Sequence, residues 1–368
     1  MLSAQALTIA IERLHAAVEA GGPLGFQFYT SQDADPVCNV AVGHYRLGEE
    51  ITTGHRLPWI CSGKPVTVIA LAQMYERGRL STATRVAEVV PEFGRHGKQD
   101  VTIEHLLTHT VLFDGDELWD TPDRATALAT ICDWPLLAPP GQRACYSGFA
   151  GWLVLAEVVQ RVSGVDFYDY VRHQVLDPLE MHSATFWHEP GDRAPRDVMF
   201  ERAADGSLEQ GGWIGGPGVV RWPGTGLWGT ASDLARPFEC VIGGGVWRGT
   251  RLMAPETVEH FFTPVRTGIP DELFSGLELS WSRGTCTDPA WFGAPKEASV
   301  TGHTGHRTSL VVGDFGRGTV VACVSNTALS SARVLRRLDN LLVRDVYEGL
   351  RAGSSAAAPA EQPTGGGR

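Results

Sequence analysis

Residues 61–80, CSGKPVTVIALAQMYERGRL, decide both the fold and the chemistry that this chain can support. From Ser62 to about Gly78 the apolar residues recur at the spacing of a helix, and Arg77 with Gly78 closes the stretch. The strand-like residues LPWI come directly before it. The pattern therefore predicts a strand that runs into a helix beginning close to Cys61.

Cys61 and Lys64 are three positions apart, so they share one face at the N-terminus of that helix. The positive end of the helix dipole and the Lys64 ammonium both favour the thiolate, which is the reactive form of cysteine. This is the environment of a nucleophile. The alternative is a structural cysteine buried beside a solvated lysine, which is the commoner state of a cysteine.

The composition is globular and excludes several classes of partner. The chain has 368 residues, of which 43% are hydrophobic, and no apolar run approaches the ~18 residues that cross a bilayer. The net charge of −11 repels phosphate backbones and anionic lipid, so we expect no nucleic acid and no membrane as partner.

At the N-terminus, Glu12 and Glu19 interrupt the apolar residues at helical spacing, which predicts an amphipathic helix rather than an export signal. We therefore expect a cytoplasmic protein.

The spacing of the cysteines and histidines does not predict a metal site. The seven cysteines are odd in number and scattered, without a C-x-x-C pair, so neither a disulfide framework nor a zinc site is expected. His303 and His306 point to opposite faces if they lie on a strand, and no third ligand is obvious. His105 and His109 share a helix face, where packing and capping account for them. We expect no metal and no other cofactor.

The two ends of the chain have strand character and the middle is helical. Strands are predicted at 25–31, 37–45, 276–283, 308–314 and 318–325. Helices are predicted at 102–109, 123–131, 149–163, 166–174, 231–242 and about 329–350. The simplest arrangement is an α+β fold, in which one antiparallel sheet is flanked by the first and last helices and carries an inserted helical lobe.

This arrangement predicts a single domain over residues 1–352. Its α/β lobe covers about 1–60 plus 246–352, and its helical lobe covers about 61–245. Pockets favour the cleft between two such lobes, so we expect the active site there. The tail, 353–368, is small, polar and rich in Pro and Gly, which predicts disorder.

Four stretches occur in one order and at typical spacing: CSGKPVTVIALAQMYERGRL, VTIEHLLTHT, CYSGFAGWLVLAEVVQRVSG and GHTGHRTSLVV. They resemble, in turn, the Ser-x-x-Lys helix, the helix that usually follows it, the Tyr-x-Asn element and the Lys/His-Thr-Gly strand of the serine β-lactamase and penicillin-binding-protein superfamily. The resemblance is to the class C β-lactamase and esterase branch and covers roughly residues 20–350. It implies a β-lactamase-like fold.

The resemblance assigns three catalytic residues. Cys61 stands where the family has its nucleophilic serine, and Lys64 stands where it has the lysine of the proton network. Tyr146 stands where it has the tyrosine general acid and base. The alternative for Tyr146 is a core tyrosine with its hydroxyl bonded to the backbone.

The same resemblance assigns the substrate-binding strand. His303, Thr304 and Gly305 would line the sheet edge that faces the nucleophile. The backbone N–H groups of Cys61 and His306 would form the oxyanion hole.

The chain departs from the family at three of these positions. Cys61 replaces the serine, Gly148 replaces the Asn of Tyr-x-Asn, and His303 replaces the Lys common in true β-lactamases. At the substrate-binding position Gly148 therefore offers no side-chain amide. Antibiotic hydrolysis is not expected, and His303 with Thr304 and Gly305 is closer to the esterase-like members.

The cysteine predicts acyl transfer. A Cys61 thioester is more receptive to neutral amines than an oxygen ester is, so the acyl group passes to an amine or alcohol acceptor. This fits an ATP-independent transacylase of natural-product biosynthesis, similar to the family member that makes the amide of capuramycin-type nucleoside antibiotics from a methyl ester. The expected partners are a small-molecule ester donor and its acceptor. The alternatives are a cysteine-dependent esterase or amidase and a catalytically silent binding or sensing protein.

Seven of the eleven tryptophans lie between residues 119 and 228. Some of them are candidates for an aromatic wall around a ring-bearing substrate, although ordinary core packing explains most of them.

Overall fold

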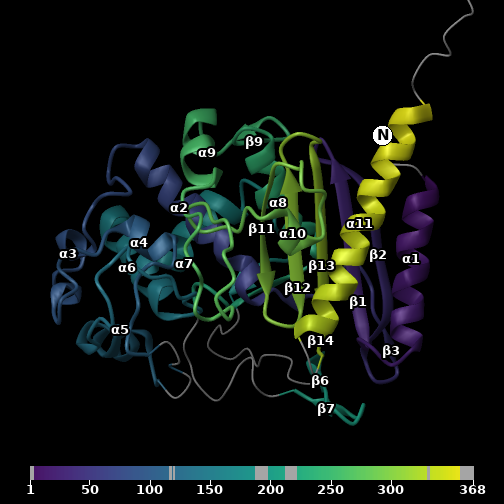
Figure 1. Ribbon diagram of the computed structural model, residues 1–368, viewed down its shortest axis with the longest axis horizontal. Coiled ribbons are helices and arrows are strands. Elements are labelled where there is room, and N and C mark those ends of the chain that lie inside the picture. Colours follow the sequence, from purple (N-terminus) through teal and green to yellow (C-terminus); the bar gives the residue numbers. More distant parts are fainter. Residues whose placement is uncertain are drawn as a thin grey trace, which may run out of the picture.

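A computed structural model describes residues 4–115, 118, 121–186, 198–211, 222–329 and 332–356. A six-stranded sheet stands between two long helices and a mainly helical lobe (Figure 1). The predicted α+β architecture with one antiparallel sheet is confirmed.

The sheet has the order β11-β12-β13-β1-β2-β3, so the N-terminal hairpin joins the late strands through β1 and β13. Its strands are β1 (Gly25–Gln32), β2 (Asp35–Arg46), β3 (Glu49–Glu50), β11 (Val300–Gly305), β12 (Ser309–Asp314) and β13 (Thr319–Ser325). Asp33 and Ala34 form the two-residue turn of the hairpin, and both have positive φ as a type I′ turn requires.

Helices cover both faces of the sheet. Helices α1 (Ala4–Glu19) and α11 (Ala332–Ala356) lie side by side on one face, where the ion pair between Arg13 and Asp345 joins them at 2.7 Å (Figure 1). Phe26 and Phe28 of β1 belong to the core on that side. Tyr29 points the other way, into the core that α8 (Ala231–Ile242) closes. The alternation along β1 is thus that of a strand buried on both faces.

The helical lobe surrounds α2 (Lys64–Glu76), which is buried from Lys64 to Met74 and has no polar face. Pro65 stands in its first turn, where a missing backbone N–H costs no helical hydrogen bond. Helix α6 (Ala150–Ser163) packs against α2 and ends at Gly164, whose φ of 75° gives the left-handed C-cap.

The other helices are α3 (Val86–Val89), α4 (Ile103–Leu107), α5 (Arg124–Asp133), α7 (Phe167–Val171), α9 (Pro255–Phe262) and α10 (Pro289–Phe292). The described residues also form the 3₁₀ turns η1 (Ile60–Gly63) and η2 (Pro91–Gly94) and the π-helical turn η3 (Arg172–Leu176). Short strands are β4 (Leu57–Pro58), β5 (Thr185–Phe186), β6 (Phe200–Arg202), β7 (Leu208–Gln210), β8 (Leu227–Gly229), β9 (Val246–Trp247), β10 (Thr250–Arg251) and β14 (Thr327–Ala328).

The strand predicted at 276–283 is wrong. Positive φ angles at Gly276 and Gly284 bound this segment, and only single bridges, such as the one between Trp281 and Cys286, pair it with its neighbours. The apolar residues at period two produced the prediction, but Leu277 is exposed whereas Trp281 is buried. The segment is a loop whose Trp281 side chain reaches the interior.

Two predicted boundaries also differ from the structure: the edge of the helical lobe and the start of the C-terminal tail. Helix α8 was expected in the helical lobe, yet it packs on β1, β12 and β13, because its apolar side chains fill the core beneath the sheet. Helix α11 continues to Ala356, so the predicted tail is helical over 353–356, and 357–368 lie outside the described residues. The rest of the predicted division into lobes stays a prediction. Within the described part of the chain, no helix has the length and apolar character that crossing a membrane requires.

Candidate active site

The turn that carries Cys61 is strained and firmly held. Strand β4 leads into η1 through Ile60, whose φ of 51° is rare for a β-branched residue and costs on the order of 1–3 kcal/mol. Trp59 fixes the turn from both sides: its N–H donates to Leu227 O at 3.0 Å, and its carbonyl accepts from Ser309 Oγ at 2.6 Å. Cys61 follows at the start of the helix, with 7% of its surface exposed.

Strand β11 lies directly against this turn. A Cβ at Gly305 would collide with the Trp59 carbonyl oxygen and with Ser309 Oγ, so only glycine allows the approach. The hydroxyl oxygens of Ser62 and Ser309 are 2.8 Å apart, which joins η1 to β12 as well. The turn that carries Cys61 and strand β11 are therefore one packed unit.

Lys64, the first residue of α2, is fully buried. Its Nζ donates to the carbonyl oxygens of Gly148 at 2.9 Å and Gly224 at 3.0 Å. The same Nζ is 5.4 Å from the ring centres of Tyr146 and Trp152, where the faces of aromatic rings attract a cation. Gly148 was predicted to bind substrate; the structure places its carbonyl on Lys64.

Tyr146 and His303 face each other across the site. His303 Nδ1 is 3.0 Å from the carbonyl oxygen of Thr304, which only accepts, so Nδ1 carries the proton. Burial, and the charge of Lys64 in second place, lower the pKa of His303 to about 3. The imidazole is therefore neutral, and its Nε2 accepts from the Tyr146 hydroxyl at 3.5 Å. Catalytic hydrogen bonds are often this long before substrate binds.

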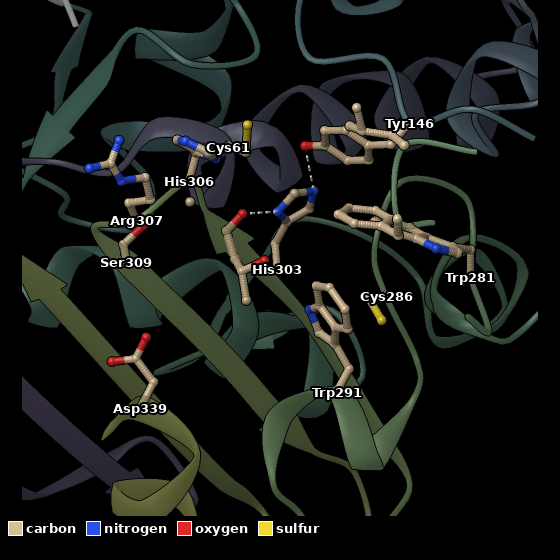
Figure 2. A pocket seen from close by; sticks show the side chains of 14 residues that line it. Cys61, Tyr146, Trp281, Cys286, Trp291, His303, His306, Arg307, Ser309 and Asp339 are labelled. Atoms are coloured by element: carbon tan, nitrogen blue, oxygen red, sulfur yellow. Dashed lines mark hydrogen bonds between the residues drawn. The ribbon is translucent and has the colours of Figure 1, made fainter. Parts of the chain in front are cut away.

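These groups open onto one cavity of about 110 Å³ (Figure 2). Among its lining residues are six that the sequence analysis predicted: Cys61, Tyr146, His303, Thr304, Gly305 and His306. Lys64 and Gly148 lie behind the wall rather than in it. His306 follows the last residue of β11, in the turn that Thr308 N closes on Gly305 O at 3.2 Å, where its backbone borders the cavity.

The cavity has two unlike ends. One end carries Phe274, Trp281 and Trp291, and the other carries Arg307, Ser309 and Asp339 (Figure 2). The sequence analysis sought an aromatic wall among the tryptophans of 119–228. Of these, Trp152 and Trp228 are buried in the main core, and Trp119, Trp187 and Trp213 lie outside the described residues.

Two residues that the sequence analysis did not place in the site hold the Tyr146 loop. His109 accepts from Cys145 N through its carbonyl at 3.0 Å and from Ser147 N through Nδ1 at 3.1 Å. Between them, Tyr146 N donates to Asp271 Oδ1 at 3.1 Å. The His109 ring also packs on the Tyr146 ring at 4.3 Å.

A buried ion pair completes this support. Arg266 Nη2 is 3.1 Å from Asp271 Oδ2, and the two side chains are 2% and 0% exposed. Arg266 Nη1 donates to Thr108 O at 2.9 Å, next to His109. The contacts thus form a closed ring from Thr108 and His109 through the Tyr146 loop to Asp271 and Arg266.

Of the prediction that His105 and His109 share a helix face and serve in capping and packing, the capping role of His105 is correct and the shared face is wrong. His105 caps α4, because Thr102 and His105 exchange the two hydrogen bonds of a capping box. His109 lies beyond the end of that helix with a φ of 56°, so the two residues do not share a helix face. Burial lowers the pKa of His109 well below its usual value.

The sequence profile of the Beta-lactamase family matches residues 12–344. Protein Rv1367c of Mycobacterium tuberculosis is 27% identical over 268 residues, which are 62% of this chain and 65% of that protein. The match thus spans slightly less than two thirds of that relative's length. Esterase EstB of Burkholderia gladioli is 26% identical over 308 residues, covering 72% of this chain and 76% of the esterase.

The solved structure of EstCE1, a hydrolase with promiscuous acyltransferase activity, has a TM-score of 0.74 at 19% identity. The superposition covers 92% of this chain and 99% of that chain. At this identity the likeness shows the fold alone, and it confirms the β-lactamase-like fold predicted from the four sequence stretches.

Asp271→Asn tests the buried ion pair. The change leaves the Arg266 guanidinium buried without an anion, so the free energy of unfolding should fall by about 3 kcal/mol or more. Denaturant unfolding measures this loss. The matched control is Glu272→Gln, because Glu272 pairs with Arg143 at an exposed position and should contribute less than about 1 kcal/mol. Equal losses in the two variants would contradict a buried, structural pair.

The depressed pKa of His303 predicts acid sensitivity. Below pH 6.5 the unfolded chain takes up a proton at His303 that the folded chain binds only near pH 3, so acidification between these values lowers the free energy of unfolding. One such proton is worth about 1.4 kcal/mol per pH unit. His303→Gln should flatten the pH dependence of unfolding in this window, and His173→Gln, at an exposed histidine, is the control. An unchanged slope in the His303 variant would mean that the folded protein binds this proton.

Proposed function

The chain belongs to the Beta-lactamase family, and from this premise we propose that it is an ATP-independent acyltransferase working through a Cys61 thioester. The acyl donor is a small-molecule ester, and the acceptor is an amine or an alcohol. We place the reaction in the cytoplasm and in natural-product biosynthesis, as for the transacylases of capuramycin type. A cofactor has no step in this mechanism.

One observation carries the proposal: the Cys61 thiol lines the same cavity as the Tyr146 hydroxyl, whose hydrogen bond goes to a neutral His303. A nucleophile and a proton-exchanging group in one cavity are the minimum that acyl transfer requires. Because the His303 imidazole accepts through Nε2, Tyr146 is present as the protonated phenol and is ready to act as an acid.

Acylation begins when the Cys61 sulfur attacks the ester carbonyl. The carbonyl oxygen becomes negatively charged and accepts hydrogen bonds from the backbone N–H groups of Cys61 and His306, which form the oxyanion hole. The carbon–oxygen bond to the leaving alcohol breaks, and Tyr146 donates the proton that this alkoxide needs. As Tyr146 gives its proton to the alkoxide, it takes up the proton of the Cys61 thiol, so the phenol is regenerated and the thiol proton ends on the released alcohol.

Deacylation reverses these roles. A neutral amine attacks the thioester, the carbon–sulfur bond breaks, and Tyr146 takes the surplus proton from the nitrogen and returns it to the Cys61 sulfur. The Lys64 ammonium, 5.4 Å from the Tyr146 ring, stabilises negative charge on the phenol oxygen during each transfer. The products are an amide and the free enzyme.

A cysteine-dependent esterase or amidase is the second candidate. The likeness to EstB, which is named an esterase, favours it. The two functions share every step as far as the thioester and differ in whether water or an amine resolves it. EstCE1 combines hydrolysis with acyltransferase activity on the same fold, so the fold is compatible with both outcomes.

Product analysis with and without an amine separates the two candidates, and Cys61→Ser tests whether thioester chemistry favours the amide. Its acyl-enzyme is an oxygen ester, less receptive to amines, so the ratio of amide to hydrolysed acid at fixed amine concentration should fall. Product analysis by mass spectrometry measures the ratio. Cys61→Ala is the control, in which intact-mass analysis should find no acyl adduct. A serine variant with an equal or higher ratio would show that acceptor binding and water exclusion, not thioester chemistry, favour the amide.

Tyr146→Phe should slow acyl transfer from an alkyl ester by about 100-fold or more, because the leaving alkoxide loses its proton donor. The rate of alcohol release measures this step. A p-nitrophenyl ester is the internal control: p-nitrophenolate leaves without a proton, so acylation by this donor should be much less affected. If both esters slow equally, Tyr146 supports the structure of the site and does not transfer a proton.

A further inference from the structure

The aromatic end of the cavity lies beside the Tyr146 ring. The Tyr146 ring centre is 5.5 Å from Phe274 and 5.8 Å from Trp281, and Phe274 is 5.1 Å from Trp291. These three rings, which we call the aromatic wall, come from the single segment 274–291 that the sequence analysis expected to include a strand. No charged side chain belongs to the wall among the described lining residues, and His303 beside it is neutral.

Contacts from outside the cavity hold Trp281 in the wall. Trp281 is held from behind by the Arg266 guanidinium, 5.3 Å from its ring, and packs edge-on against His109 at 5.1 Å. Trp281 and Trp291 are both buried. The buried ion pair that supports the Tyr146 loop therefore also supports the wall, so the proton-exchanging hydroxyl and the rings are fixed relative to one another.

The position of Cys61 between the two ends of the cavity indicates which end binds the acceptor and which binds the acyl group. Figure 2 shows Cys61 between the Tyr146 hydroxyl on one side and His306 with Arg307 on the other. The attacking nitrogen must lie within hydrogen-bond reach of the Tyr146 hydroxyl to lose its proton. The body of the acceptor must then extend over the aromatic wall, while the acyl group extends toward Arg307, Ser309 and Asp339.

We propose that the aromatic wall is the acceptor site and that it selects primary amines with an apolar or aromatic body and no carboxylate. This inference rests on the proposed function and names its acceptor class. Ring faces attract the ammonium of an arriving amine and bury its hydrocarbon body. A carboxylate on that body would be desolvated without a partner, which is costly. Amino acids are therefore rejected although their amines are competent nucleophiles.

The test compares two acceptors that differ in one group, benzylamine and 4-(aminomethyl)benzoate, with p-nitrophenyl acetate as acyl donor. The expected result is a kcat/KM for amide formation at least about 10-fold higher with benzylamine. Equal rates, or preference for the carboxylate, would place the acceptor at the Arg307 end and overturn the inference.

Variants of the wall give a second measurement. Trp291→Leu and Phe274→Leu should each raise the KM for benzylamine by about 10-fold, because each removes a ring that contacts the body of the acceptor. Leu277→Ala is the matched control, because Leu277 belongs to the same segment but is exposed and outside the cavity lining. An unchanged KM in the two wall variants would overturn the inference.

A different measurement tests the proposed function independently of the acceptor site. If intact-mass analysis of the unaltered protein finds no acyl group on Cys61, the acyltransferase and the acceptor site are both wrong. If the acyl-enzyme forms and amines resolve it without the expected preference, only the acceptor site is wrong.

Discussion

The burial of the Lys64 ammonium is the constraint on which the site depends. A charge without access to water must be surrounded by dipoles, and here the carbonyl oxygens of Gly148 and Gly224 and two ring faces surround it. These groups belong to the Tyr146 loop, the turn before β8 and α6. Satisfying one cation therefore fixes three segments around α2, and the same charge contributes to keeping His303 neutral.

The ring of contacts from Thr108 to Arg266, which lies behind the Tyr146 loop, also positions segments around a buried charge. A buried ion pair rarely adds much net stability, because desolvation offsets the attraction. Its effect is geometric: Asp271 can satisfy the Tyr146 N–H and the Arg266 guanidinium together only when the two segments lie at one separation. A backbone bridge between Ala144 and Asp271, in which Glu272 N donates to Ala144 O at 2.9 Å, joins the same two segments and helps to set the position of the Tyr146 loop relative to the aromatic wall.

The sequence predicted the parts of the site that carry local signals. Cys61 and Lys64 follow from helical spacing, and Tyr146 and His303 follow from the resemblance to a family; all four lie around one cavity or directly behind it. Arg266 and Asp271 carry no such signal, because an ion pair closed across a loop has neither period nor motif. The alternation of apolar residues near Trp281 indicated a strand, but positive φ at Gly276 and Gly284 and burial in the cavity wall prevailed over that pattern.

The replacements at positions 61 and 148 are consistent with each other. A serine nucleophile needs a base to remove its proton in the transition state, and in this family the lysine belongs to that proton network. Here two backbone carbonyl oxygens and two aromatic faces surround Lys64, and all four favour the protonated ammonium over a neutral amine. A thiol ionises far more readily than a hydroxyl, so the proposed Cys61 nucleophile depends less than a serine does on a neutral lysine that removes its proton. The backbone carbonyl of Gly148 accepts from Lys64 Nζ and so helps to stabilise a cation in the site, which agrees with the role proposed for Cys61.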